Sequence, residues 1–143
     1  MILSEIMNKD VAKTEIGTTV LEASKIMAEK KISYILVTTN SSLAGILTED
    51  DIVRKVVAEG RDASKTKVED IMIKEVIHLP PDKTLEEAAA VMSEHKIKKI
   101  PVVEGSRLLG IVTAAEMVAA EPKIVEHLGE LVIFAKKQQR MAG

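Results

Sequence analysis

Two short strings combine a hydroxyl and a carboxylate at a spacing that could bind a sugar phosphate. Gly45 to Asp51 reads Gly-Ile-Leu-Thr-Glu-Asp-Asp, and Gly110 to Glu116 reads Gly-Ile-Val-Thr-Ala-Ala-Glu. An acid three residues after a threonine, at the start of a helix, could accept ribose hydroxyls, while the free N–H groups of the first turn favour phosphate. The same spacing describes a capping box, in which the two side chains satisfy those N–H groups. Spacing alone leaves both interpretations open and slightly favours the cap.

Other combinations of reactive side chains are missing from the sequence. The histidines, His78, His95 and His127, do not have the spacing of metal ligands, and the chain contains no cysteine. No Ser-His-Asp arrangement or phosphate-binding glycine loop is present. Only Tyr34 and Phe134 are aromatic, which leaves almost no platform for stacking nucleic-acid bases. We therefore expect no catalytic residues, no metal site and no catalytic cofactor, and predict that the chain is not an enzyme.

Charge and hydropathy restrict the partners further. The 20 basic and 22 acidic side chains nearly cancel, so no overall field attracts nucleic acid or an anionic membrane. No stretch reaches the roughly 18 uncharged apolar residues of a membrane helix. The first three residues are followed at once by polar and charged ones, unlike a secretory segment. We expect a cytoplasmic protein with no membrane partner and no nucleic-acid partner.

The chain is an internal duplication. Ile6–Arg54 overlays Ile71–Ala119 without a gap, and about 19 of some 49 paired positions are identical. Two repeats are too few for a solenoid, so we expect them to pack face to face as a pseudo-twofold pair. We divide the sequence into repeat 1 (1–62), repeat 2 (63–121) and a helical tail (122–143).

Each repeat predicts the same βαββα order of elements, which places the chain in the α/β (α+β) class. Helices are expected from Thr19 and Thr84, and second helices after Thr48 and Thr113, because apolar residues follow helical spacing there. Short extended pieces and two hairpins complete the repeats. The extended pieces are expected at Val11–Thr14 and Val76–Leu79, and the hairpin strands at Tyr34–Thr39, Leu43–Thr48, Ile100–Glu104 and Leu108–Thr113.

The predicted second helices and the predicted tail helix should each have an apolar face. The second helices are expected to bury Ile52, Val53, Val56 and Val57 in repeat 1 and Met117 and Val118 in repeat 2. Pro122 should open the tail helix, which ends near Lys136, Lys137 and Arg140. Its predicted apolar stripe consists of Ile124, Leu128, Leu131, Val132 and Ala135.

The paired repeats, each ending in Gly-x-x-Thr-x-x-acid, resemble CBS domains, and together they resemble a CBS pair, or Bateman module, from about Ile6 to Ala120. Thr-Val/Leu-x-Glu-Ala helices and the strand Ile100-Pro101-Val102-Val103 add to the resemblance. It implies a stand-alone regulatory module that senses AMP, ADP or ATP, or else S-adenosylmethionine or NAD, in the cleft between the repeats. It also implies a homodimer that acts on an unknown protein target.

The resemblance further implies two pockets, each combining the Thr-x-x-acid of one repeat with strand residues of the other. Pocket 1 would consist of Ile46, Thr48, Asp51, Ile77, Ile97, Lys98 and Lys99, with Asp51 on the ribose and the lysines on phosphate. Pocket 2 would consist of Ala12, Ile32, Ser33, Tyr34, Ile111, Thr113 and Glu116. We expect pocket 2 to be weaker, since Glu116 adds a methylene and Ser33 and Tyr34 supply no positive charge. Asp50 and Ala115 stand where the family often has arginine, which disfavours polyphosphate at both.

One alternative explains the same residues without a ligand. In it, the Thr-x-x-acid strings are only helix caps, and the chain is a structural module for dimerisation or interaction.

Overall fold

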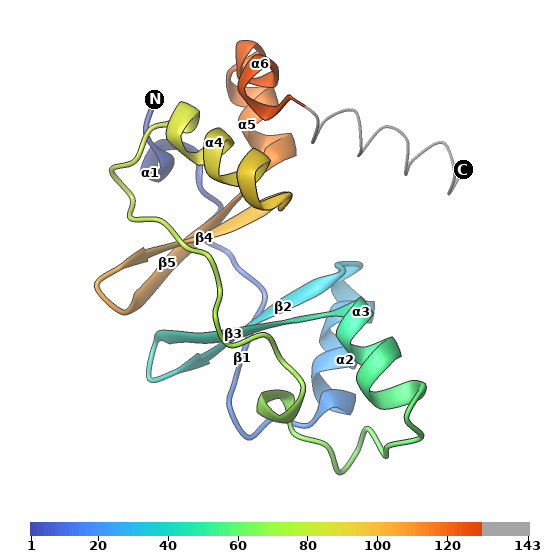
Figure 1. Cartoon of the computed structure of the whole chain (residues 1–143). Coiled ribbons are helices and arrows are strands. Elements are labelled where there is room, and N and C mark those ends of the chain that lie inside the picture. Colours follow the sequence, from blue (N-terminus) through green and yellow to red (C-terminus); the bar gives the residue numbers. More distant parts are fainter. Residues whose placement is uncertain (130–143) are drawn as a thin grey trace. The chain divides into compact units, whose positions relative to one another are not determined.

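The computed structural model describes residues 1–129, which divide into two compact units (Figure 1). The repeat-1 unit consists of Asp10–Val76 with Ser106–Leu108. Within the described residues, the repeat-2 unit consists of Met1–Lys9, Ile77–Gly105 and residues 109–129. The element order confirms the predicted mixed α/β class with two βαββα repeats, although the first strand of repeat 2 is reduced to a single bridge between Leu79 and Val102.

The elements of the repeat-1 unit surround one antiparallel hairpin. The strands β2 and β3 form that hairpin, with an irregularity between Val37 and Thr38, and β1 pairs with β2 in parallel. The bounds are β1 Lys13–Glu15, α2 Val20–Lys30, β2 Tyr34–Thr39, β3 Ser42–Thr48, α3 Glu49–Ile52, a π-helical turn at Val53–Val57 and a 3₁₀ turn at Val68–Asp70.

The repeat-2 unit contains the matching elements and both ends of the described chain. Its bounds are α1 Leu3–Ile6, α4 Leu85–His95, β4 Lys99–Glu104, β5 Arg107–Thr113, α5 Ala114–Ala120, a 3₁₀ turn at Pro122–Ile124 and α6 Val125–Leu128.

The helices α2 and α4, which are equivalent in the two repeats, begin and end in the same way. The hydroxyl of Thr19 accepts a hydrogen bond from the Glu22 amide at 3.1 Å, and Thr84 accepts one from Glu87 at 3.1 Å. Each helix ends at a lysine, Lys31 or Lys96, in the left-handed conformation. These caps confirm the predicted helix starts.

The second helix of repeat 1 departs from the prediction. Val56 is buried, but Val53 is 57% exposed and Val57 is 69% exposed, so their predicted burial is wrong. A π-helical turn over Val53–Val57 holds more residues per turn than the 3.6 of an α-helix, so the spacing that predicted burial of Val57 does not apply there. Val53, the first residue of that turn, already faces solvent. In repeat 2, Met117 is buried and Val118 half-buried, as the α-helical spacing predicts.

The start of the predicted tail helix is visible in the described residues. Pro122 opens a 3₁₀ turn that leads into α6, and Ile124 and Leu128 are buried against the repeat-2 core. The remaining predicted stripe and the basic helix end lie outside the described residues. Those residues are Leu131, Val132, Ala135, Lys136, Lys137 and Arg140.

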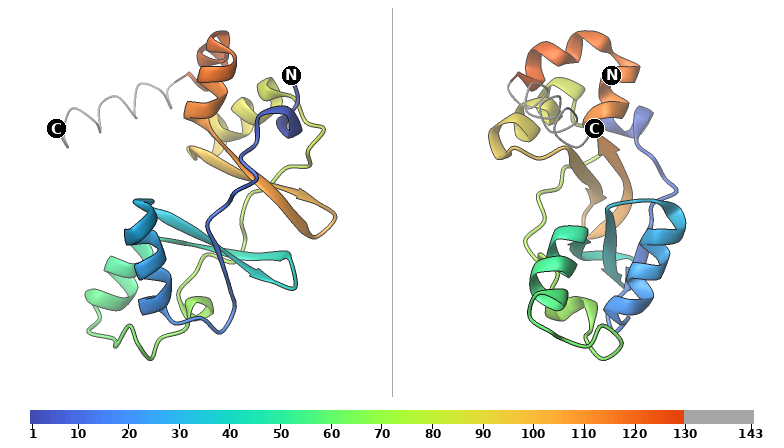
Figure 2. Two further views of the ribbon diagram at one scale, coloured as in Figure 1. Left: turned by 180° about the vertical axis from the view of Figure 1, so that it is seen from behind. Right: turned by 90° about the vertical axis from the view of Figure 1, so that its right-hand side faces the viewer.

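The segment that opens each repeat packs with the other repeat's elements. Leu3 donates its amide to the carbonyl of Lys83 at 2.9 Å, and Asn8 and Ile111 exchange backbone hydrogen bonds. Equivalent bonds join Val68 to Thr18 in the repeat-1 unit, where Ile73 and Ile46 exchange another pair. Figure 2 shows the N-terminal segment, in dark blue, beside the yellow and orange elements of repeat 2.

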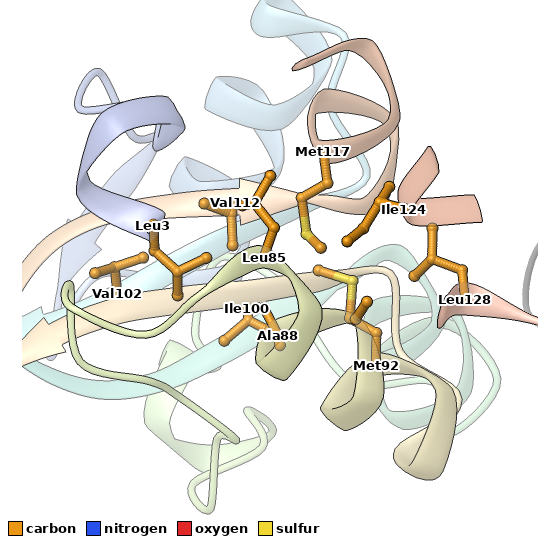
Figure 3. Packing of buried hydrophobic residues seen from close by; sticks show 11 residues of the cluster. Leu3, Leu85, Ala88, Met92, Ile100, Val102, Val112, Met117, Ile124 and Leu128 are labelled. Atoms are coloured by element: carbon orange, nitrogen blue, oxygen red, sulfur yellow. The ribbon is translucent and has the colours of Figure 1, made fainter. Parts of the chain in front are cut away.

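The repeat-2 core explains how this segment is held. Leu3 is completely buried in a cluster that also contains residues of α4, the hairpin, α5 and α6, and Figure 3 shows this cluster. Burying one such leucine side chain stabilises a fold by about 2 kcal/mol. The first residues of the chain are therefore part of the repeat-2 core.

Candidate functional site

The first Thr-x-x-acid string forms a complete capping box at the start of α3. Asp51 Oδ2 accepts hydrogen bonds from the backbone amide of Thr48 at 3.1 Å and from its hydroxyl at 2.9 Å. The Thr48 hydroxyl in turn accepts the amide of Asp51 at 3.2 Å. Only 5% of Asp51 is exposed, so the carboxylate is enclosed as well as bonded.

The second string forms the same box at the start of α5, with one oxygen left over. Glu116 Oε1 accepts the amide of Thr113 at 3.2 Å and its hydroxyl at 2.9 Å, and the hydroxyl accepts the amide of Glu116 at 3.2 Å. Among residues 1–129, nothing donates a hydrogen bond to Glu116 Oε2, and the side chain is half-buried. The longer side chain therefore completes the cap and still presents one acceptor.

A lysine that the sequence reasoning missed engages the remaining oxygen of the first box. Lys55 Nζ lies 3.1 Å from Asp51 Oδ1 and donates a hydrogen bond to the carbonyl of Ile71 at 2.9 Å. The spacing of four residues between an acid and a lysine on a helix could have revealed this pair. Position 120, the equivalent of Lys55 in repeat 2, is alanine.

The two lysines of the predicted phosphate site lie beside the second box. The amide of Ala114, the first residue of α5, donates to the carbonyl of Lys98 at 2.8 Å. Lys99 follows at the start of β4, and burial together with the charge of Lys98 lowers the pKa of its ammonium group. Two ammonium groups on adjacent residues thus make this end of the repeat-2 unit locally positive.

Repeat 1 places different residues at the matching point. The amide of Glu49 donates to the carbonyl of Ser33 at 2.9 Å, and Tyr34 pairs with Thr48 across the hairpin. The first turn of α3 then carries Glu49, Asp50 and Asp51. This end of the repeat-1 unit is consequently acidic, whereas its counterpart carries two lysines.

The members of the two predicted pockets are divided between the units. Pocket 1 draws Ile46, Thr48 and Asp51 from the repeat-1 unit, and its other members, Ile77, Ile97, Lys98 and Lys99, from the repeat-2 unit. Pocket 2 is divided likewise, with Ala12, Ile32, Ser33 and Tyr34 in the repeat-1 unit and Ile111, Thr113 and Glu116 in the repeat-2 unit. The two groupings stay predictions. Within single units, the backbone joins Lys98 to the Thr113 box and Ser33 to the Thr48 box.

The predicted base-contacting residues have unequal exposure. Ile46 is 8% exposed and Ile111 1% exposed, and each pairs its backbone with the opening segment that packs there. Ile32, Ile77 and Ile97 are half-buried and present part of their surface. The half-buried isoleucines are thus better placed than Ile46 or Ile111 to meet a ligand.

The glycine of each string serves the opening segment. A Cβ at Gly110 would lie 2.7 Å from the carbonyl oxygen of Asn8, and one at Gly45 would lie 2.7 Å from that of Ile73. Backbone oxygens cannot give way as a flexible side chain does. The close approach of the opening segment therefore accounts for a glycine at each position.

A groove of about 550 Å³ lies between α2 and the α3 segment of the repeat-1 unit. Its walls are mainly apolar, and Val53 stands at its edge. The full lining is Ser24, Met27, Ala28, Lys31, Ile32, Glu49, Ile52 and Val53.

The CBS domain family matches residues 3–58 and 68–123, which are the two repeats together with the segments that open them. The chain belongs to the CBS domain family. The two matches form a tandem CBS pair that covers most of the chain, as the resemblance in sequence implied.

Known CBS proteins of similar size align along most of their length. The CBS domain-containing protein YhcV of Bacillus subtilis is 31% identical over 115 residues, which is 80% of this chain and 81% of YhcV. A putative signal-transduction protein with CBS domains from Burkholderia ambifaria is 32% identical with a TM-score of 0.74, covering 84% of this chain and 93% of that one.

One similar structure contains adenosyl ligands. The CBS domain pair of protein MJ0100, in complex with 5′-methylthioadenosine and S-adenosyl-L-methionine, is 28% identical with a TM-score of 0.72. The alignment covers 84% of this chain and 94% of that one. Relatives of this CBS pair therefore include a protein that binds adenosyl compounds.

The described residues contain neither a candidate membrane span nor a candidate metal cluster. Among their helices, none combines the length and apolar character that a membrane span requires. Within the same residues, no three histidine, aspartate or glutamate side chains gather where they could hold a metal ion.

Proposed function

We propose that this CBS pair is a regulatory module that binds an adenine nucleotide, AMP, ADP or ATP, at the Glu116 capping box of the repeat-2 unit. The observation that carries the proposal is the hydrogen bond from Ala114 to the carbonyl of Lys98. It brings the start of a lysine pair against the first turn of α5, next to a carboxylate with one unused oxygen among the described residues.

Each group at this site suits one part of a nucleotide. Glu116 Oε2 would accept ribose hydroxyls, as acidic residues do in other nucleotide sites. Lys98 and Lys99 would bind the phosphate through charge-assisted hydrogen bonds. The half-buried Ile77 and Ile97 of the same unit would contact the base.

The repeat-1 residues support a weaker or differently charged site. None of the predicted pocket residues in this unit carries a positive charge. They are Ala12, Ile32, Ser33, Tyr34, Ile46, Thr48 and Asp51. Glu49 and Asp50 add negative charge at the first turn of α3, which disfavours phosphate. We therefore propose a stronger site at Glu116, whereas the sequence alone favoured the pocket of Asp51.

The proposed mode of action is binding without turnover. The threonine and the acid of each box bond to one another and to the backbone, an arrangement that holds a helix start rather than activating a nucleophile. The other ligand classes that the sequence suggested, S-adenosylmethionine and NAD, carry the same adenosine group and belong in the test below.

Association without a ligand is a second candidate, favoured by the exposed Val53 and Val57. The two valines lie four residues apart in the π-helical turn, and Val53 also lines the apolar groove of α2 and α3. Exposed apolar surface of this kind is typical of an interface. We propose that this face contributes to a homodimer, which is compatible with nucleotide binding at Glu116.

Titration calorimetry and thermal shifts with AMP, ADP, ATP, adenosine, S-adenosylmethionine and NADH test the nucleotide site. A ligand at about 100 times its dissociation constant should stabilise the protein by about 2.7 kcal/mol. Replacing Lys98 and Lys99 with alanine should weaken AMP binding by at least about tenfold and adenosine binding little.

The matched control replaces Lys25 and Lys30, two exposed lysines of α2, with alanine. This variant should bind AMP as the unmodified chain does. Absence of binding by every ligand at millimolar concentration would leave association as the better-supported function.

A further inference from the structure

The carboxylate of Asp51 already has a complete set of partners inside the protein. Oδ2 is bonded to the amide and hydroxyl of Thr48, and Oδ1 faces the ammonium group of Lys55 at 3.1 Å. The side chain of Asp51 is 7% exposed, whereas that of Lys55 is 44% exposed. Lys55 therefore lies on the solvent side of the pair, next to Oδ1 of the buried carboxylate.

Lys55 is held in this position by a second bond. Its Nζ donates to the carbonyl of Ile71 at 2.9 Å, and Ile71 is 2% exposed. Exposed lysines on a helix exchange among many conformations and gain little from an acid four residues away. A lysine fixed at two points, one of them a buried carbonyl, loses that freedom and stays against Asp51.

An exposed pair on the same turn shows the contrast. Arg54 lies 2.8 Å from Asp50, also four residues apart, but their side chains are 76% and 70% exposed. That pair is an ordinary surface ion pair, and solvent competes with it freely. Lys55 and Asp51 have the same spacing with a buried carboxylate.

In the part of the chain that the structure describes, repeat 2 has no equivalent of this contact. Ala120 stands where repeat 1 has Lys55, and Oε2 of Glu116 accepts no hydrogen bond within residues 1–129. The acid of one box is closed by an internal cation, while the acid of the other keeps an acceptor.

We propose that Lys55 is a specificity-determining residue that closes the repeat-1 box to ribose. Its ammonium group occupies the carboxylate oxygen that a diol would need, and the chain consequently has one nucleoside site instead of two. The inference rests on the proposed function, because it takes the acid of each box to be the ribose acceptor.

The decisive variant is Lys55→Ala, which gives repeat 1 the residue that repeat 2 has at position 120. Equilibrium dialysis with radiolabelled adenosine measures the number of molecules bound per chain. Adenosine is the probe because it lacks phosphate and is indifferent to the missing lysines of repeat 1. We expect one equivalent for the unmodified chain, two for Lys55→Ala, and one again for Lys55→Ala combined with Asp51→Asn.

The matched control is Arg54→Ala, which removes one positive charge from the same turn without touching Asp51. It should bind one equivalent. Circular dichroism checks that each variant is folded, and Lys55→Met, which retains an apolar stem over the core, replaces Lys55→Ala if the alanine variant unfolds.

The outcomes separate this inference from the proposed function. One equivalent in both the unmodified chain and the folded Lys55 variants overturns the role of Lys55 and leaves nucleotide binding intact. No binding by the unmodified chain, with one Asp51-dependent equivalent in Lys55→Ala, supports Lys55 and contradicts the Glu116 site. No binding by any folded variant overturns both.

Discussion

The two capping boxes of this chain have the same backbone and different surroundings. Thr48 with Asp51, and Thr113 with Glu116, make matching hydrogen bonds at distances that agree within 0.1 Å. Around them, one box has an acidic first turn and a cation from Lys55, while the other has a nearby lysine pair and, within residues 1–129, no cation bonded to its carboxylate. The two repeats therefore share the capping box and differ in the charges around it.

The divergence matters because a cap and a ligand site compete for the same oxygen atoms. A carboxylate with both oxygens bonded internally stabilises the helix start but offers little to a diol. A carboxylate that caps with one oxygen can do both. On this view the longer glutamate, which the sequence suggested as a defect, lets repeat 2 combine the two roles.

The largest expected effect tests what the two boxes share. Gly45→Ala and Gly110→Ala should each lower the free energy of unfolding by about 1–3 kcal/mol, because the new Cβ meets a backbone oxygen that must shift. Urea unfolding measures the loss. Hydrogen exchange should locate it at Ile46 and Ile73 in the first variant, and at Asn8 and Ile111 in the second.

Each glycine variant is the control for the other, since the damage should stay within one unit. If Gly110→Ala kept full stability and lost only nucleotide binding, the glycine would serve a ligand instead of the opening segment.

The next largest change in stability is expected from replacing the acid of each capping box, because within residues 1–129 only Asp51 of the two is paired with a lysine. Asp51→Ala should destabilise the protein by about 2 kcal/mol, because it removes the cap and leaves Lys55 without its buried partner. Glu116→Ala should cost about 1 kcal/mol, the usual value for a lost cap. Unfolding in urea at neutral pH gives both values, and equal losses would contradict the role assigned to Lys55.

The smallest effect concerns the lysine pair. Burial and the charge of Lys98 lower the pKa of Lys99 in the folded chain, so the unfolded chain binds more protons between that pKa and the ordinary lysine value of about 10.4. Stability should therefore rise with pH in that range. Lys99→Met should reduce the rise, measured by urea unfolding between about pH 8 and pH 10.

The exposed Lys25 supplies the comparison for this experiment. Lys25→Met should retain the pH dependence of the unmodified chain, and an identical slope in Lys99→Met would show that the lysine pair is not coupled to folding.

The helices and hairpins could be predicted from the sequence because apolar residues recur at regular spacing, and the same spacing occurs in both repeats. Val20, Ala23 and Met27 mark one face of α2, and their counterparts mark α4, so helices and hairpins could be predicted with small shifts at their ends. The π-helical turn at Val53–Val57 could not, since its valines fit an α-helix equally well.

The candidate site was less predictable, because contacts between distant residues leave little trace in spacing. Leu3 and Val68 open the two repeats with the same pattern, and nothing in that pattern states which hairpin each will cover. The bond between Ala114 and Lys98 likewise depends on how the β4–β5 hairpin closes. Lys55 was the exception, since its distance of four residues from Asp51 was available in the sequence.

The burial of Leu3 in the repeat-2 core has a consequence for synthesis of the chain. The residues of α4, α5 and α6 that share the buried cluster with Leu3 extend to Leu128, and at ordinary rates of translation they follow Leu3 by on the order of ten seconds. Residues 10–76 form most of the repeat-1 unit and can begin to fold in that interval. Leu3 is thus made well before its partners in the second repeat, and its apolar side chain stays accessible to chaperones on the ribosome until that repeat is complete.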